Sequence, residues 1–76
     1  MELPQYRSHK VVGAAKIIAI DNDARVTLDG VDTPHYVGHQ WLEEKHAEVG
    51  GYFVQYEDGY CSYSPAKAFE EGYTRV

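Results

Sequence analysis

Residues 51–65 read Gly51-Tyr52-Phe53-Val54-Gln55-Tyr56-Glu57-Asp58-Gly59-Tyr60-Cys61-Ser62-Tyr63-Ser64-Pro65. Four of the seven tyrosines of the 76-residue chain fall in this stretch. Asp58-Gly59 suits a tight type I′ turn, and the residues before and after it alternate as strand residues do. The stretch therefore predicts an aromatic β-hairpin that returns from Tyr60 to Tyr63. The face of its first strand that carries Tyr52 also carries Val54 and Tyr56, and the opposite face carries Phe53 and Gln55.

The N-terminal half predicts a second hairpin. Residues 10–20 are mostly apolar, and their β-branched pairs favour a long strand, bent near Gly13, over the alternative of a helix. Asp21-Asn22-Asp23 has turn chemistry and ends this strand. Residues 25–29 then alternate between apolar and polar side chains, which places Val26 and Leu28 inward and Arg25, Thr27 and Asp29 toward water.

A helix is expected after the second strand. Thr33-Pro34 combines an N-cap residue with a proline at the first helical position, and it predicts a helix from Pro34 to about Ala47. Gly38 makes the first turn of this helix irregular, and Gly50-Gly51 terminates it. Helical spacing gives one apolar stripe, formed by Val37, Trp41 and the stem of Lys45 with Leu42 beside it.

Ser64-Pro65 repeats the Thr33-Pro34 pattern and predicts a short capped helix through Glu71, which Gly72 stops. Residues 73–76 could add a short C-terminal strand. The fold class expected is α+β, a small single domain over residues 1–76 in the order β-β-α-β-β-α with antiparallel hairpins. Residues 1–8 are a candidate flexible segment. A chain of this length buries only about 60% of the surface of its unfolded form, so we expect marginal stability.

Charge and composition exclude several function classes. The net charge is −5, and the acidity lies in residues 31–76, so we expect neither nonspecific nucleic-acid binding nor membrane binding. Cys61 is the only cysteine, and no apolar run reaches the length of a signal segment or a membrane span. These features predict a soluble protein of a reducing cytoplasm.

No motif in the sequence assembles a catalytic, metal or cofactor site. His35 and His39 are four apart on the predicted helix with His46 further on, yet exposed helix histidines explain them better than a metal site. Adjacent glutamates on a helix, as in Glu43-Glu44 and Glu70-Glu71, point about 100° apart and do not meet at one substrate. Ser64 is interpreted as a cap and Cys61 as a small packing residue. We therefore expect no enzyme activity and no cofactor.

The tyrosines leave three interpretations open, of which core packing is the default. A protein-docking surface is the second, because Tyr is common in interface hot spots and acidic neighbours select a partner. Its candidate residues are Tyr52, Tyr56, Glu57, Asp58, Tyr60 and Tyr63. Stacking of a nucleobase or nucleotide signal is the third, and its candidate cations are Arg7, Lys10 and Arg25.

Motifs at both ends resemble a family of small proteins of tailed bacteriophages and prophages. The matching segments are Tyr6-Arg7-Ser8-His9-Lys10-Val11-Val12, Gly51-Tyr52-Phe53-Val54, Glu57-Asp58-Gly59, Ser64-Pro65-Ala66-Lys67-Ala68-Phe69 and Gly72-Tyr73. The middle of the chain, from about Asn22 to Glu48, has no counterpart, and His9-Lys10 departs from the Lys-Pro pair usual in the opening motif. The resemblance implies a phage or prophage origin and no particular mechanism.

Three functional hypotheses follow. The first is a phage-encoded accessory protein that binds and modulates a bacterial host protein without catalysis, for example in counter-defence. The second is a protein that binds or sequesters a small ligand or nucleotide signal, as a homo-oligomer. The third is a minor structural or assembly factor of the virion.

Overall fold

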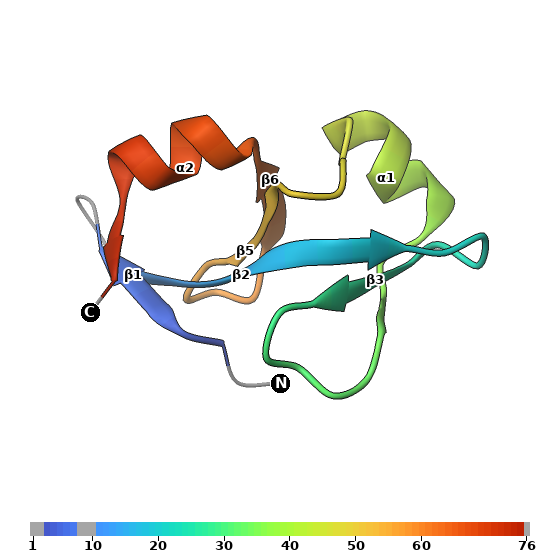
Figure 1. Ribbon diagram of the computed structural model, residues 1–76, viewed down its shortest axis with the longest axis horizontal. Helices are drawn as coiled ribbons and strands as arrows, with labels where there is room; N and C mark the ends of the chain where they lie inside the picture. The colour runs from blue at the N-terminus through green and yellow to red at the C-terminus, as the bar shows by residue number, and fades with distance from the viewer. Residues whose placement is uncertain (1–2, 8–10, 76) are drawn as a thin grey trace.

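Strand β2 (Val11–Ile20) organises the sheet because it pairs with three other strands (Figure 1). The computed structural model describes residues 3–7 and 11–75. β1 (Gln5–Arg7), β3 (Arg25–Leu28) and β5 (Tyr52–Gln55) all lie antiparallel to β2. The predicted long strand is confirmed. Its register shift falls between Ile17 and Ala19, whereas the sequence analysis placed the irregularity near Gly13.

The partners of β2 divide between its two edges. The Ala14 N–H donates to the Pro4 carbonyl and the Lys16 carbonyl accepts from the Asp29 N–H, so β1 and β3 follow one another along the same edge. The Ile17 N–H donates to the Gly51 carbonyl on the other edge, where β5 lies. A single strand thus joins the N-terminal hairpin to the aromatic one.

Five further elements complete the sheet and its cover. β6 (Cys61–Ser64) pairs with β5, β4 (His35–Tyr36) with β3, and β7 (Thr74–Arg75) with β1. Helices α1 (His39–Lys45) and α2 (Ala66–Gly72) lie on the other side of β2 from β1 in Figure 1. The α+β class, both hairpins and the C-terminal strand are confirmed, and β1 and β4 are strands that the sequence analysis did not expect.

The predicted first helix begins too early. Thr33-Pro34 caps nothing, because the next residues pair with β3 as β4. Gly38 stands at the N-cap with φ 90, a left-handed value that favours glycine, and α1 starts only at His39. The helix also ends before Gly50-Gly51, since His46 adopts the left-handed conformation at the C-cap. Pairing with a neighbouring strand overrode the local cap pattern.

The second helix forms where expected but without the predicted cap. Pro65 occupies the N-cap and no side chain caps the helix. Ser64 ends β6, and its Oγ donates to the Pro65 carbonyl across 3.4 Å. Gly72 is the last helical residue, and Tyr73 then turns extended to enter β7.

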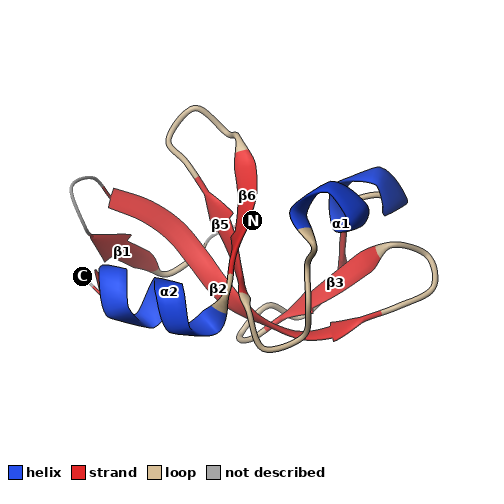
Figure 2. Ribbon diagram, turned by 90° about the horizontal axis from the view of Figure 1, so that it is seen from above, coloured by secondary structure: helices blue, strands red, loops and turns tan. Residues whose placement is uncertain are grey.

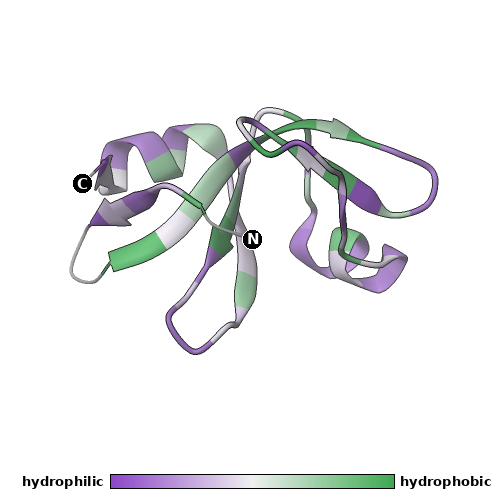
Figure 3. Ribbon diagram, turned by 90° about the horizontal axis from the view of Figure 1, so that it is seen from below, coloured by the Kyte–Doolittle hydropathy of each residue, from purple (hydrophilic) through white to green (hydrophobic). Residues whose placement is uncertain are grey.

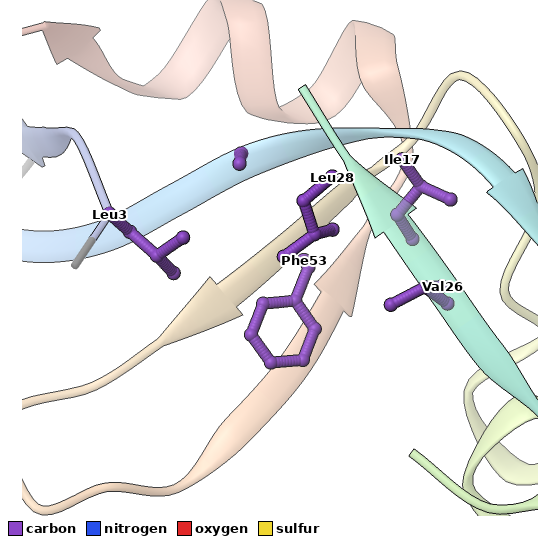
Figure 4. Close-up of a cluster of buried hydrophobic side chains, with 6 residues drawn as sticks. Leu3, Ile17, Val26, Leu28 and Phe53 are labelled. Carbon is purple, nitrogen blue, oxygen red and sulfur yellow. The ribbon is translucent and has the colours of Figure 1, made fainter. Parts of the chain in front are cut away.

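Both faces of the central sheet are buried, and each face belongs to a different hydrophobic cluster. On one face Phe53 packs with Ala15, Ile17, Leu3 and the inward pair of β3, Val26 and Leu28 (Figure 4). On the other face Phe69 of α2 packs on Val12, Ala14, Tyr52 and Val54. The alternation predicted for residues 25–28 and 52–55 is confirmed, because neighbouring residues of β5 belong to different clusters.

Candidate protein-docking site at the hairpin tip

The hairpin turn projects from the sheet and extends away from α2 (Figure 2). The Gly59 N–H donates to the Tyr56 carbonyl and the Tyr56 N–H to the Tyr60 carbonyl, each across 2.9 Å. Gly59 has φ 92, whereas Asp58 has no positive φ. A type I′ turn needs positive φ at both central residues, so the predicted turn type is wrong. The loop is a type I turn followed by a left-handed glycine, and Oδ1 of Asp58 accepts from the Tyr60 N–H.

The turn brings two tyrosine rings together. Tyr56 and Tyr60 stack with centroids 5.9 Å apart and 22° between the ring planes. Tyr60 is 54% exposed, whereas Tyr56 packs partly against the cluster under α2. Two backbone hydrogen bonds hold this five-residue loop and so fix the positions of the two Cα atoms from which the rings extend. The tip therefore presents a pre-organised aromatic surface.

Helix α1 supports this surface from one side. Nζ of Lys45 donates to the Tyr60 hydroxyl and lies 4.9 Å from the centre of the Tyr60 ring. The hydrogen bond with Tyr60 raises the pKa of Lys45, so the ammonium stays charged. Nε1 of Trp41 donates to the Cys61 carbonyl across 3.3 Å. Helical spacing placed Trp41 and Lys45 on one stripe, but the pattern did not predict that this stripe meets the hairpin.

Two of the six predicted docking residues do not lie on this surface. Tyr52 is only 9% exposed, stacks on Phe69 and donates its hydroxyl to Glu70. Tyr63 is half-buried against the cluster of Phe53, and its ring fills the space that a side chain on Gly51 would need. Tyr52 belongs to the core and Tyr63 packs against it, because the sheet is covered on both faces.

The remaining members form the tip with an acidic edge. Glu57 and Asp58 are exposed beside the stacked rings, and the turn is coloured as hydrophilic in Figure 3. A cavity of about 220 Å³ lies between Val11 and residues 56–58. The described tip thus combines an exposed ring, two carboxylates and a recess, which suits a basic protein surface.

The alternative nucleotide site does not assemble. Arg7 lies opposite Val11 at the start of β2, and Arg25 follows the turn at the far end of that strand. Ten strand residues separate the two positions by about 30 Å. Arg25 is also engaged, since its Nε contacts Oδ2 of Asp21 across 2.9 Å. Lys10 lies outside the described residues. Arg7 and Arg25 therefore cannot meet at one phosphate.

The histidines are separated by the fold. His35 lies in β4 with its ring 5.2 Å from that of Phe53, so His35 and His39 do not share a helix face. His46 is the C-cap of α1. Within residues 3–7 and 11–75, no group of three His, Cys, Asp or Glu side chains could hold a metal ion. This overturns the geometry considered for a helical His pair.

Cys61 and the glutamates of the two Glu-Glu pairs have structural partners. Burial raises the pKa of the Cys61 thiol, which lies 3.5 Å from the Gly59 carbonyl. Oε2 of Glu70 accepts from Tyr52 and lies 3.7 Å from Nζ of Lys16. Oε1 of Glu44 accepts from the Gln40 side chain on the exposed face of α1. Each of these groups takes part in packing or in a local pair.

No protein-family model, curated protein or solved structure matches this chain. Among the described residues, no helix is both long and apolar enough to cross a membrane.

Proposed function

We propose that this chain is a small phage- or prophage-encoded accessory protein that binds and modulates a bacterial host protein, without catalysis, through the tip of its aromatic hairpin. The observation that carries the proposal is the stack of Tyr56 and Tyr60 on a hydrogen-bonded turn, with Tyr60 held by Lys45. A rigid, exposed tyrosine loses little conformational entropy when it is buried in an interface. The resemblance to phage proteins motivates a host protein as the partner.

The charge of the tip defines the partner further. Glu57 and Asp58 are exposed at the turn, and the chain carries a net charge of −5. Opposite charge across an interface speeds encounter and selects among partners. The proposed partner surface is therefore basic, with a pocket or flat apolar area that receives the Tyr60 ring.

The test is capture of a partner from bacterial lysate by the tagged full chain. The expected result is one stoichiometric partner that the wild type retains and Tyr60→Ala loses. Tyr36→Ala is the matched control, because Tyr36 is 67% exposed but lies in β4, outside the tip. With the purified partner, Tyr60→Ala should weaken binding by more than about 2 kcal/mol, roughly 30-fold, as an interface hot spot does.

The charge requirement has its own test. Reversing Glu57 and Asp58 to lysine should slow association and reduce its dependence on salt. Equal retention of the partner by wild type, Tyr60→Ala and the charge-reversed variant would contradict docking at the tip. Light scattering of the free chain measures its oligomeric state. If the protein instead had a role in the virion, the chain would be found in purified phage particles.

A further inference from the structure

A cavity of about 480 Å³ opens on the face of the sheet that α2 covers, and residues 56–60 take no part in lining it. Its lining includes Tyr6 of β1, Lys16 of β2, Tyr52 of β5 and Arg75 of β7. The strand register explains why these side chains meet. Tyr6 lies opposite both Val12 and Arg75, and Lys16 lies opposite Tyr52, so all of them stand on one face.

The cavity exists because one edge of β2 changes partner there. The Ala14 N–H donates to the Pro4 carbonyl, and only two residues later the Lys16 carbonyl accepts from the Asp29 N–H, each across 2.9 Å. Proline has no N–H, so Pro4 cannot return a bond to Ala14 and the pairing with β1 stops. The ends of β1 and β3 therefore face each other across a notch, and Pro4, Asp29 and Gly30 line it.

The charge in this notch is opposite to that of the whole protein. Two cations, Lys16 and Arg75, and one carboxylate, Asp29, line the cavity, whereas the chain has a net charge of −5. Lys16 is partly engaged by Glu70 across 3.7 Å. Arg75 makes no ion pair with any described residue and is exposed. Glu70 offsets the charge of Lys16, and the exposed Arg75 leaves a cation beside the recess that attracts anions.

The walls of the cavity are aromatic and fixed. Tyr6 contacts Tyr52 edge to face with centroids 6.4 Å apart, and both rings pack on Phe69. Small-ligand sites commonly measure 300–1,000 Å³ and combine aromatic walls with a few polar groups. We propose that this cavity binds a small organic anion, an aromatic ring that carries a phosphate or carboxylate. The anionic group contacts Arg75 and Lys16, and the ring lies against Tyr6. This site is independent of the docking surface at the hairpin tip.

The proposal is tested by NMR titration of the full chain with three probes that share one ring: phenyl phosphate, benzoate and benzylamine. Saturable shifts are expected for the amides of Tyr6, Lys16 and Arg75 with the two anions and not with the amine. The order of the two anion affinities identifies phosphate or carboxylate as the preferred group. Arg75→Ala should weaken anion binding about tenfold, as expected for the loss of a charged hydrogen bond, and Arg75→Lys should restore part of it.

Two further variants separate the site from general charge effects. Lys67→Ala removes an exposed cation of α2 that does not line the cavity, and it should leave affinity unchanged. Glu70→Gln keeps an acceptor for Tyr52 but releases Lys16 from its ion pair, so anion affinity should rise. The proposal fails if benzylamine binds as well as the anions, if Lys67→Ala matches Arg75→Ala, or if neither anion gives saturable shifts.

Discussion

The hydroxyl of Tyr52 donates a hydrogen bond to Oε2 of Glu70 across 2.9 Å and so ties β5 to α2. The ring of the same tyrosine is buried and stacks on Phe69. The opposite face of the sheet holds Phe53, one residue further along the strand. Tyr52 thus holds α2 against one face of the sheet. The ionisation of its hydroxyl is therefore coupled to folding.

The first prediction concerns pH. Burial, and then the hydrogen bond with Glu70, raises the pKa of Tyr52 from 10.0 to about 12. Because the folded protein favours the neutral phenol, this contribution to stability is complete below pH 10 and is lost as the pH rises toward 12. Tyr52→Phe should cost about 1 kcal/mol at neutral pH, for one hydrogen bond, and should flatten the alkaline loss of stability. Chemical unfolding at a series of pH values measures both effects.

Tyr36→Phe provides the matched control for this prediction. Tyr36 is exposed, so removal of its hydroxyl should change stability little. Phenolate absorbance should show that Tyr52→Phe removes a phenol with a pKa of about 12. The same alkaline slope in Tyr52→Phe and wild type would contradict the coupling.

The second prediction concerns Gly51. A Cβ on this residue would overlap the ring of Tyr63, which packs in the cluster of Phe53. Gly51→Ala should therefore destabilise the protein by about 1–3 kcal/mol through overpacking. In a Tyr63→Ala background the same change should cost much less, because the ring is absent. A double-mutant cycle measured by thermal or denaturant unfolding tests this, and additive costs would rule out the clash.

Two other glycines give the third prediction as a matched pair. Gly59 has φ 92 in the hairpin turn, whereas Gly72 ends α2 without a positive φ, and neither would meet an atom within 4 Å as alanine. Gly59→Ala should destabilise by about 1 kcal/mol, because a side chain strains the left-handed backbone. Gly72→Ala should stabilise by about 0.4–1 kcal/mol. Equal effects in unfolding experiments would contradict the assigned turn.

The fold was predictable where side-chain pattern and pairing agree. The alternation of Val26 and Leu28 identified the inward face of β3, and the aromatic stretch identified the hairpin of β5 and β6. Thr33-Pro34 gave a wrong start for the first helix, because His35 and Tyr36 pair with β3 instead of forming a helical turn. β1 has no apolar pattern of its own, and it is a strand because β2 and β7 pair with it on both sides. The local pattern of such a segment does not show that neighbouring strands will pair with it.

The site was half predictable for a similar reason. Turn chemistry placed Tyr56 and Tyr60 near an exposed tip, and the structure keeps them there. Alternation shows which tyrosines share a face but not that both faces are covered, so it could not separate the buried Tyr52 and the half-buried Tyr63 from the exposed Tyr60. Lys45 was missed because its contact with Tyr60 spans 15 residues.

The last prediction concerns α1, which supports the tip. The helix has seven residues and no buried ones, and isolated helices shorter than about 12–15 residues are marginal in water. The helix must therefore be held by tertiary contacts. Trp41 donates a hydrogen bond to the Cys61 carbonyl, and its ring packs against that of Phe53 with the ring centroids 5.9 Å apart. Trp41→Phe keeps a ring but removes the donor.

Amide hydrogen exchange should then accelerate in α1 by roughly two- to tenfold, the effect of one lost hydrogen bond, while exchange in β2 stays slow. Gln40→Ala is the control, because its side chain is exposed and donates a hydrogen bond to Glu44 on the outer face of α1. If the tip needs α1 to hold Tyr60 in place, Trp41→Phe should also weaken partner binding, because a less ordered ring loses more entropy on docking. Equal acceleration in α1 and β2 would instead mean that the helix opens only when the whole domain unfolds.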